Sequence, residues 1–418
     1  MKRIPGIFLL IFSLVNLVSA QTNNSPYSVL GIGDIEDSYF NRTNGMASTG
    51  IAYRSNRNLI DNNPASFSAL DNQWFIGELG IRGKYINYSG KPVDPSNNRS
   101  FDITFRRFAV GTRIGKHWGS SVGLAPFSSE NYEFNALQPI QGTVGETANA
   151  YYQGYGGVNR VYWTNAYDFF HHVSIGVNAS YLFGSITQKT ILQNPQIANA
   201  YVSTNKNLFL SNLYFNYGIQ FYGKIGSHWN VVVGGTFANR SDLSAQANTT
   251  VLGLDSSVLK SQSVDGIYFT LPNMYGAGIS ITKDNKYTFL ADYKFQEWSP
   301  LNYTGYNYAL TNSNRVSLGF EISHKQNVYN NQVETNFFHA GVYYGDSYLN
   351  VFGQKIQDMG ASLGVGLNTK RSPFAYTLTF QYGVKGTTNS QLIKENYFSI
   401  SFLLSYRDFW FTRGKRFN

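Results

Sequence analysis

The stretch LYFNYGIQFYGKI at residues 213–225 alternates apolar side chains with polar or small ones almost without interruption. Leu213, Phe215, Ile219 and Phe221 share one phase of this alternation, and Asn216 belongs to the other. A repeat of two residues is the pattern of a β-strand whose two faces meet different surroundings. A strand with one face in lipid and the other in an aqueous lumen keeps such a pattern over about ten residues. We therefore interpret residues 213–225 as a membrane-spanning strand.

The same alternation recurs along the chain, whereas no comparable stretch after residue 20 shows the 3.6-residue period of an amphipathic helix. The sequence therefore predicts an all-β fold, a transmembrane antiparallel β-barrel. The alternative, a soluble β-sandwich, would place the apolar alternates in a shared core. Long connections on only one side favour the barrel. Further alternating segments are 287–296, 316–322, 374–382 and 398–406.

The connections between the predicted strands have two lengths. Outer-membrane barrels have short periplasmic turns and longer extracellular loops. Six short connections alternate with seven longer ones, which predicts fourteen strands, an even number as single-chain bacterial barrels require. The predicted turns lie near 115–119, 168–172, 226–230, 283–286, 325–335 and 368–372, and the predicted loops near 90–98, 128–149, 188–206, 241–265, 299–312, 346–354 and 385–394.

The composition of the 418 residues is typical of a membrane barrel. Only 14% are Asp, Glu, Lys or Arg, against about 25% in soluble proteins, and 16% are aromatic. The mean hydropathy is −0.26, so apolar residues are interleaved with polar ones, which excludes helical spans of about 20 apolar residues. The absence of cysteine excludes disulfides, thiolate metal sites and thiol nucleophiles. The formal net charge of +9 forms no stripe, so we expect no nucleic-acid binding.

The first twenty residues have the features of a secretory signal peptide. Lys2 and Arg3 provide a positive start, residues 7–18 form a short apolar core, and cleavage is predicted between Ala20 and Gln21. We therefore expect export, with the mature chain in the outer membrane. The predicted domains are the signal peptide (1–20), an N-terminal hatch or plug (21–72), the transmembrane barrel (73–408) and a periplasmic C-terminal tail (409–418).

Residues 21–72 precede the first alternating segment and lack its period. They are rich in Asn, Ser and Gly, including Gly31, Gly33 and the triplet Asn63-Pro64-Ala65. A lumen enclosed by fourteen strands is too wide for wall side chains alone to fill. We therefore predict that this segment plugs the barrel. A disordered periplasmic leader is the alternative, but the aromatic and aliphatic residues between 27 and 70 give the segment side chains to bury.

These motifs resemble the FadL-type family of outer-membrane transporters for long-chain fatty acids and aromatic hydrocarbons, in the form found in Bacteroidetes. Gly45-Met-Ala-Ser-Thr-Gly50 followed by Asn63-Pro64-Ala65 is similar to the hatch of that family. The loops differ from those of the family prototypes, so no ligand-contacting residue there is carried over. Three further stretches are similar in order and spacing: Leu271–Gly278, Ala291–Ser299 and Arg407–Phe411.

The resemblance implies a monomeric barrel, plugged by its hatch, that takes up a hydrophobic small molecule and releases it sideways into outer-membrane lipid through a gap in the wall. Proline cannot donate a ladder hydrogen bond, and Pro126, with Gly123 and Phe127, forms the predicted wall kink. Alternatively, Pro126 ends its strand at the extracellular rim. A break in the alternation at Arg106-Arg107 predicts a β-bulge that turns an arginine inward.

The alternation also places charged side chains in the lumen, because a charge on the lipid face costs about 2–4 kcal/mol for Arg or Lys near the midplane. One interpretation is that the hatch residues Arg54, Arg57 and Asp61 pair with these charges and hold the plug, since buried charges are usually paired. The alternative is that a lumen Arg or Lys meets a substrate carboxylate. The predicted lumen charges are Arg106, Arg113, Lys224, Asp292, Lys294, Arg315 and Glu321.

The sequence contains no His-x3-His pair, no Gly-x-Ser-x-Gly elbow and no phosphate loop. His171 and His172 are adjacent, so in a strand they face opposite sides and cannot jointly ligate one metal ion. We therefore predict no enzymatic activity, no catalytic residues, no metal and no cofactor.

Three hypotheses for the function remain. The first is passive uptake of hydrophobic molecules, gated by the hatch, which requires an apolar pocket behind the loops near 128–149 and 188–206. The second is a non-transporting barrel that acts as a scaffold or attachment partner in cell-surface protein secretion, which requires no continuous path. The third is a general porin, which would lack the plug.

Overall fold

The computed structural model of the chain describes residues 25–36, 40–72, 74–91, 93, 96, 98–140, 147–193, 201–305, 307–328, 331–368 and 373–409. The predicted signal peptide with its cleavage site at Ala20 and Gln21, and the tail from residue 410 onward, lie outside the described residues. Within the described part, no helix has the length and apolar character needed to cross a membrane.

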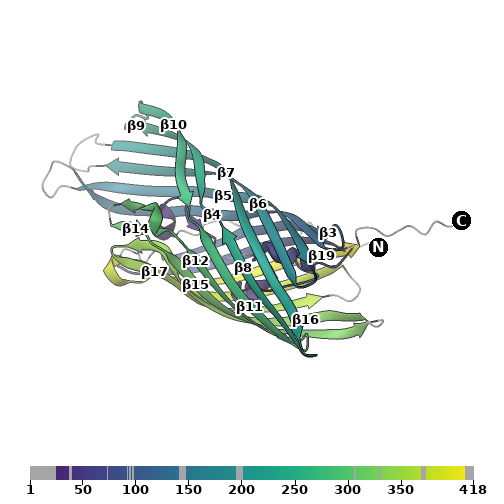
Figure 1. Cartoon of the computed structure of the whole chain (residues 1–418). Coiled ribbons are helices and arrows are strands. Elements are labelled where there is room, and N and C mark those ends of the chain that lie inside the picture. The colour runs from purple at the N-terminus through teal and green to yellow at the C-terminus, as the bar shows by residue number, and fades with distance from the viewer. Residues whose placement is uncertain are drawn as a thin grey trace, which may run out of the picture.

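The strands form one closed antiparallel sheet, in which the last strand pairs with the first strand of the wall (Figure 1). β8 and β9 lie end to end along β7, and β10 and β11 lie end to end beside them. Each of these two pairs therefore forms one interrupted strand, and the wall has the fourteen strands that the sequence predicts. The wall strands are β2 (Trp74–Ser89), β3 (Arg99–Arg113), β4 (Trp118–Pro139), β5 (Thr147–Phe169), β6 (Val173–Gln193), β7 (Tyr201–Ile225), β8 (Trp229–Ala238), β9 (Ser241–Leu252), β10 (Val258–Leu271), β11 (Met274–Lys283), β12 (Tyr287–Gln296), β15 (Ser313–Val328), β16 (Asn331–Val351), β17 (Gln354–Asn368), β18 (Phe374–Lys385) and β19 (Lys394–Phe409).

Six short connections lie at one end of the barrel, which we call the turn end, and seven lie at the other, the loop end. Several predicted loops are wrong in detail because strands continue through them. β9 and β10 occupy most of 241–265, and β16 and β17 reach to within two residues of each other at Phe352 and Gly353. Beyond the bilayer neither face of a strand has to be apolar, so these extensions carry no alternation that the sequence analysis could detect.

The connection between β12 and β15 has short elements of its own. It contains η6 (Ser299–Leu301), β13 (Thr304–Gly305) and β14 (Tyr308–Leu310), and β14 pairs with β16. The connection between β18 and β19 contains η7 (Asn389–Gln391).

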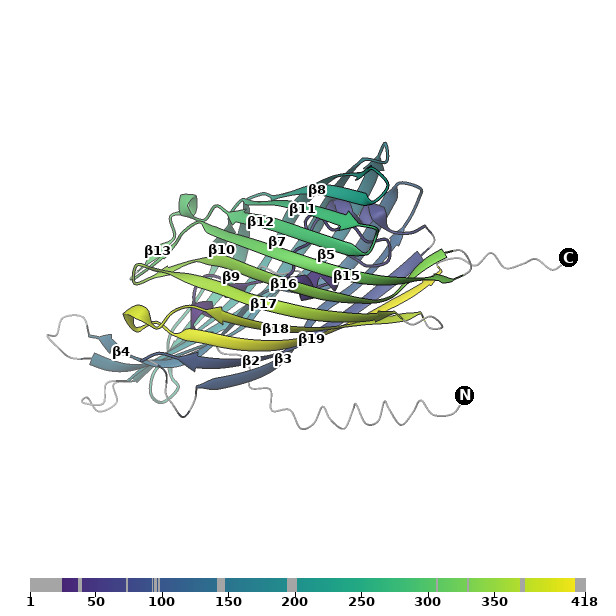
Figure 2. The same cartoon turned by 90° about the horizontal axis from the view of Figure 1, so that it is seen from below.

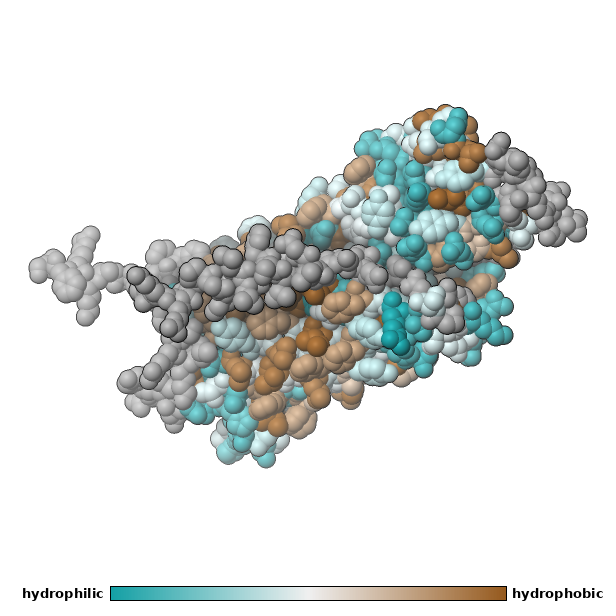
Figure 3. Space-filling model, turned by 180° about the vertical axis from the view of Figure 1, so that it is seen from behind, coloured by the Kyte–Doolittle hydropathy of each residue, from teal (hydrophilic) through white to brown (hydrophobic). Residues whose placement is uncertain are grey.

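The alternation seen in the sequence separates the two faces of the wall. On β7, Leu213 and Phe221 are 55% and 51% exposed on the outside, whereas Gln220 between them is fully buried on the inside. Figure 3 shows hydrophobic side chains gathered over the part of the wall nearer the turns, and hydrophilic ones more frequent toward the loop end. The outer face therefore has the apolar band that a lipid bilayer requires.

Residues 25–72, which we call the N-terminal segment, lie inside the barrel wherever they are described (Figure 2). η3 (Arg42–Met46) contacts β15, β16, β17 and β18, and η4 (Pro64–Ala69) contacts β4, β5, β6 and β7 on the other side of the lumen. The side chains of Asn41 and Asn63 accept hydrogen bonds from backbone N–H groups of the first turn of η3 and η4, which are typical N-caps. The remaining elements are η2 (Pro26–Val29) and β1 (Asp34–Ile35), which pairs with β4.

Glycines of the wall allow this segment to touch the backbone of the barrel. A side chain at Gly176 of β6 would overlap the backbone of Pro64, and one at Gly341 of β16 would overlap the backbone of Met46. These two contacts lie on different sides of the lumen, so the segment is packed against the wall in both directions. Glycine is the residue that permits such a close backbone approach.

This packing predicts that Gly176→Ala and Gly341→Ala loosen the segment. We expect each variant to lower the melting temperature of the barrel and to speed proteolytic cleavage of residues 40–70. Gly223→Ala on β7 is the matched control, because no atom lies within 4 Å of its added methyl group. Cleavage rates and melting temperatures equal to the control would contradict the packing described here.

Candidate functional site

The N-terminal segment is tied to the wall through a buried arginine in η3. The guanidinium of Arg42 donates to Glu321 of β15 at 3.0 Å and to Glu334 of β16 at 2.6 Å. It also stacks on the ring of Phe337 at 3.7 Å, and the Arg42 side chain is only 3% exposed. Burial alone would lower the pKa of Arg42, but the carboxylates of Glu321 and Glu334 outweigh burial and hold the pKa well above its usual value. Arg42 is therefore a permanent cation held by two anions.

Glu321 also contacts one residue of the N-terminal segment and one residue of the wall. The hydroxyl of Tyr53, from the segment, donates to Glu321 at 2.9 Å, and Nε2 of His339, from the wall, lies 2.7 Å from the same carboxylate. Burial and the neighbouring carboxylates hold the pKa of Tyr53 well above its usual value, although the charge of Arg42 opposes them. The tyrosine is therefore a hydrogen-bond donor at any physiological pH.

A second cluster lies on β2 and β3, where the predicted bulge is present. The register between these strands shifts between Gly80 and Ile81, which leaves Arg106 outside the ladder and turns both Arg106 and Arg107 inward. Arg107 donates to Asp61 of the segment at 2.8 Å and lies 3.5 Å from Glu78 of β2.

Arg106 meets a different residue of the segment. It forms an ion pair with Glu36, to which Arg82 of β2 donates at 3.2 Å. Burial raises the pKa of Glu36, but the two guanidinium groups outweigh that effect and hold the pKa well below its usual range. Nearby, Nζ of Lys385 on β18 lies 2.7 Å from Asp34.

Two contacts combine a side chain with backbone groups. The carboxylate of Asp292 on β12 accepts the backbone N–H groups of Gly50 and Ile51 at 2.6 and 3.0 Å. The side-chain amide of Asn63 donates to the carbonyl oxygens of Ile219 and Gly235, at 3.1 and 3.2 Å. The wall therefore recognises the backbone of the segment as well as its charges.

The segment also contacts the last strand of the barrel at both ends. At the loop end, Ser25 Oγ donates to Glu395 of β19 at 2.7 Å, and the hydroxyl of Tyr27 donates to the carbonyl of Ile393 at 2.5 Å. At the turn end, Arg407 of β19 donates to the side chain of Asn58 at 2.6 Å. Because β19 pairs with β2, these bonds lie beside the seam that closes the barrel.

The residues predicted for the hatch all lie in the lumen, but their partners differ from those expected. Of the three charged ones, Asp61 meets a wall arginine. Arg54 instead donates to Gln220 and stacks on Tyr222, and Arg57 pairs with Asp71 inside the segment. Gly31 and Gly33 have positive φ angles; Gly31 lies against the ring of Phe269, and Gly33 lies against the backbone of Ser129. Asn63 is the N-cap of η4 and Pro64 is its first residue. Ala65 is fully buried.

The predicted lumen charges divide into two groups. Arg106, Asp292 and Glu321 bind the segment as described, and Arg113 donates to the carbonyl of Leu70 at 3.0 Å. The other three meet wall residues or open space. Lys294 and Arg315 are cross-strand neighbours, Arg315 stacks on Tyr343 at 4.0 Å, and Lys224 lines a cavity.

Several of the strongest contacts join residues that the alternation in the sequence does not identify. Arg42, Asp34 and Glu36 stand in an irregular segment where no period identifies an inward side. Glu334 falls in the predicted turn 325–335, whereas β16 begins at Asn331. One signal in the sequence does point to Arg42. If the segment fills the lumen, an arginine within it is buried and needs a carboxylate partner.

The wall is incomplete between β3 and β4. Their ladder has six pairs, from Arg113 with Gly119 to Phe108 with Leu124, and none above them. Pro126 follows two residues later, and the β4–β5 ladder shifts register between Pro126 and Ser128. Pro126 does not end its strand, because β4 continues to Pro139. β1 of the segment pairs with β4 just above this point, at Ser128 and Ser129.

The loop end of the lumen is filled by apolar side chains. Tyr27, Ile32 and Ile35 of the segment pack among Phe127, Leu182, Leu208, Phe269, Trp298 and Tyr348 of the wall and its loops. At the turn end, a cavity of about 930 Å³ lies between the segment and the short turns. Its lining includes the charged side chains of Arg42, Arg54, Lys224, Glu321, Glu334 and Arg407.

The closed fourteen-stranded wall with a segment inside it defines a β-barrel of the FadL-like fold. A FadL homologue of Pseudomonas aeruginosa superposes with a TM-score of 0.62 at 11% identity, over 91% of this chain and 100% of that one. The toluene transporter TodX of Pseudomonas putida gives 0.59 at 14%, over 93% and 100%. The monoaromatic hydrocarbon channel CymD gives 0.56 at 15%, over 91% and 98%.

The family model of BamG matches residues 1–418, so the chain belongs to the BamG family. No curated protein matches it. The resemblance to FadL-type transporters seen in the sequence is therefore confirmed for the fold, whereas the family that the chain belongs to is BamG.

We predict that Arg42→Met destabilises the protein by about 3–5 kcal/mol, because it leaves two buried carboxylates without their cation. The measurement is the free energy of unfolding in denaturant. Arg57→Met is the control, since its ion pair with Asp71 is about one third exposed and such pairs contribute at most about 1 kcal/mol. Equal losses in the two variants would contradict a special role for Arg42.

Proposed function

We propose that this protein is a closed outer-membrane barrel that acts as a partner of the β-barrel assembly (BAM) machinery, and that its N-terminal segment is a permanent plug. Membership of the BamG family supports the partner role. The observation that carries the proposal is the ring of ion pairs that joins the segment to the wall, at Arg42, Glu36 and Asp61. We propose no enzymatic activity.

The energetics favour a plug that stays in place. Removing one partner from a buried ion pair costs about 3–5 kcal/mol. A ligand of micromolar affinity contributes about 8 kcal/mol, and it can shift an equilibrium only by its differential affinity for the two states. Displacement of the segment would have to break three such clusters together, and a small apolar ligand has no charged group with which to replace any of the partners. The same plug argues against a general porin.

The lining of the lumen supports the same proposal. The position behind β4 to β7 where an uptake channel needs an apolar pocket is packed with side chains of the segment, including Ile32. The cavity at the turn end is lined with charged groups. A hydrophobic molecule loses favourable transfer free energy when it passes such groups, because their hydration must be disturbed.

Uptake of hydrophobic molecules is the second candidate, and one feature favours it. The interrupted ladder between β3 and β4, with Pro126 just above, is where a lateral exit would lie. A hollow of about 510 Å³ at the loop end of β4, β5 and β6, lined in part by Leu137 and Ile191, would be its entrance.

The plug predicts a simple change in conductance. Deleting residues 21–66 while keeping the signal peptide should convert a closed barrel into a conducting one, measured as single-channel current in planar bilayers. The intact chain is the reference. Unchanged conductance in a folded deletion variant would contradict the plug.

The two candidate functions predict opposite results when the protein is depleted from its native cells. A BAM partner should co-purify with the assembly machinery, and its depletion should lower the amount of folded outer-membrane barrels while uptake of labelled long-chain fatty acid is unchanged. Pro126→Thr should leave co-purification intact. Loss of uptake on depletion or in Pro126→Thr, with normal barrel assembly, would contradict the proposal and favour the second candidate.

A further inference from the structure

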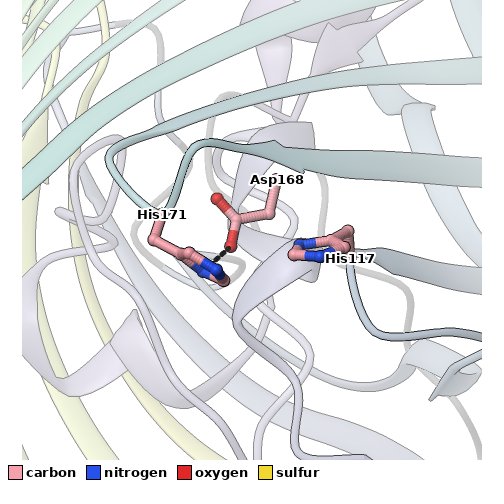
Figure 4. Close-up of side chains that lie close together, drawn as sticks. All are labelled: His117, Asp168 and His171. Carbon is pink, nitrogen blue, oxygen red and sulfur yellow. Dashed lines mark ion pairs between the residues drawn. The ribbon is translucent and has the colours of Figure 1, made fainter.

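Two histidines and one aspartate from neighbouring connections meet at the turn end of the barrel. His117 lies in the connection between β3 and β4, His171 lies in that between β5 and β6, and Asp168 is near the end of β5. Their candidate donor atoms all lie within 4.8 Å of one another. Figure 4 shows the Asp168 carboxylate between the two imidazole rings, with His171 Nδ1 3.7 Å from Asp168 Oδ2.

We propose that His117, Asp168 and His171 form a binding site for a divalent transition-metal ion, of which Zn²⁺ fits best. Two imidazoles and one carboxylate are a donor set that Zn²⁺ accepts, with water in the fourth position. Donors around tetrahedral zinc lie about 3.4 Å apart, as follows from bonds of about 2.0–2.1 Å. The three side chains therefore need to close by a little more than 1 Å.

The surroundings of the ligands suit such a closure. The Asp168 side chain is 7% exposed and accepts a hydrogen bond from Tyr222, whereas the His171 side chain is 76% exposed, so few neighbours oppose its rotation toward Asp168. The backbone N–H of Asp168 donates to the carbonyl of His117 at 2.9 Å, which holds the two connections together. The two imidazole rings are 5.1 Å apart. The buried carboxylate of Asp168 thus lies between the half-buried imidazole of His117 and the exposed imidazole of His171.

An independent observation points to a missing ligand. Nδ1 of His117 is buried and has no hydrogen-bond partner among the residues that the structure describes. A buried imidazole nitrogen normally has a partner, and a metal ion beside Asp168 would engage this ring. An ion pair between His171 and Asp168 alone would leave His117 unexplained.

The carboxylate also has the outer partner that metal ligands usually have. Asp168 Oδ1 accepts a hydrogen bond from the hydroxyl of Tyr222 on β7. Outer hydrogen bonds of this kind orient the ligand, and their loss typically lowers metal affinity 10–100-fold. The ring of Tyr222 in turn lies 3.8 Å from the guanidinium of Arg54. A bound ion would therefore link the β3–β4 and β5–β6 connections next to the plug.

The experiment is a titration of the full-length, folded barrel, purified without a polyhistidine tag, with Zn²⁺ by calorimetry and with Co²⁺ by visible absorption. We expect one saturable equivalent of Zn²⁺ and a tetrahedral Co²⁺ spectrum. His117→Ala and His171→Ala should each weaken binding by more than tenfold, and Tyr222→Phe by roughly tenfold.

The control is His228→Ala, because His228 pairs with Asp284 at another turn and the described residues give that pair no third ligand. This variant should bind like the wild type. Absence of a saturable equivalent in the wild type would overturn the proposal, as would equal affinity in the wild type, His117→Ala and His171→Ala. Shifts in electrophoretic mobility on heating verify that each variant is folded.

Discussion

The requirement that every buried charge has a partner determines how this barrel is built. Arg42 is buried between η3 and the wall strands β15 and β16, where an unpaired cation would cost several kcal/mol. Glu321 and Glu334 supply its anions from two neighbouring strands. This contact requires that η3 lies beside β15 and β16, that both carboxylates point into the lumen, and that the register of the two strands brings them to the same guanidinium.

The outer and inner surfaces of the wall follow from different constraints. The outside needs only apolar side chains, so it is built by simple alternation and tolerates many residue types. The inside must match one particular segment, and it does so with glycines where the backbones touch and with charges where they do not. The inward residues are therefore specific, whereas the outward ones are interchangeable.

The sequence predicts the all-β fold and the fourteen strands because alternation is a local property of each strand. It also predicts the bulge at Arg106, because a bulge shifts the phase of that alternation. The long strands beyond the bilayer were missed, since nothing outside the membrane enforces a phase. The contacts of Arg42 and the cluster of His117, Asp168 and His171 were missed because they join residues far apart in sequence. The adjacency of His171 and His172 excludes a metal site formed by these two residues within one strand. It does not exclude a site that His171 forms with residues of another turn, such as His117.

The hydrogen bonds at the two ends of β19 make the closure of the barrel sensitive to the register in which β19 pairs with β2. Ser25 and Asn58 bond to side chains near the two ends of β19, and Tyr27 bonds to Ile393, the residue just before this strand. If β19 paired with β2 two residues out of register, its groups would move by about 6–7 Å and all three bonds would be lost together. A shift by two residues keeps every side chain on its proper face, so alternation alone does not penalise it. The bonds of Ser25, Tyr27 and Asn58 thus depend on the alignment of β19 with β2, and only a correctly aligned barrel forms all of them.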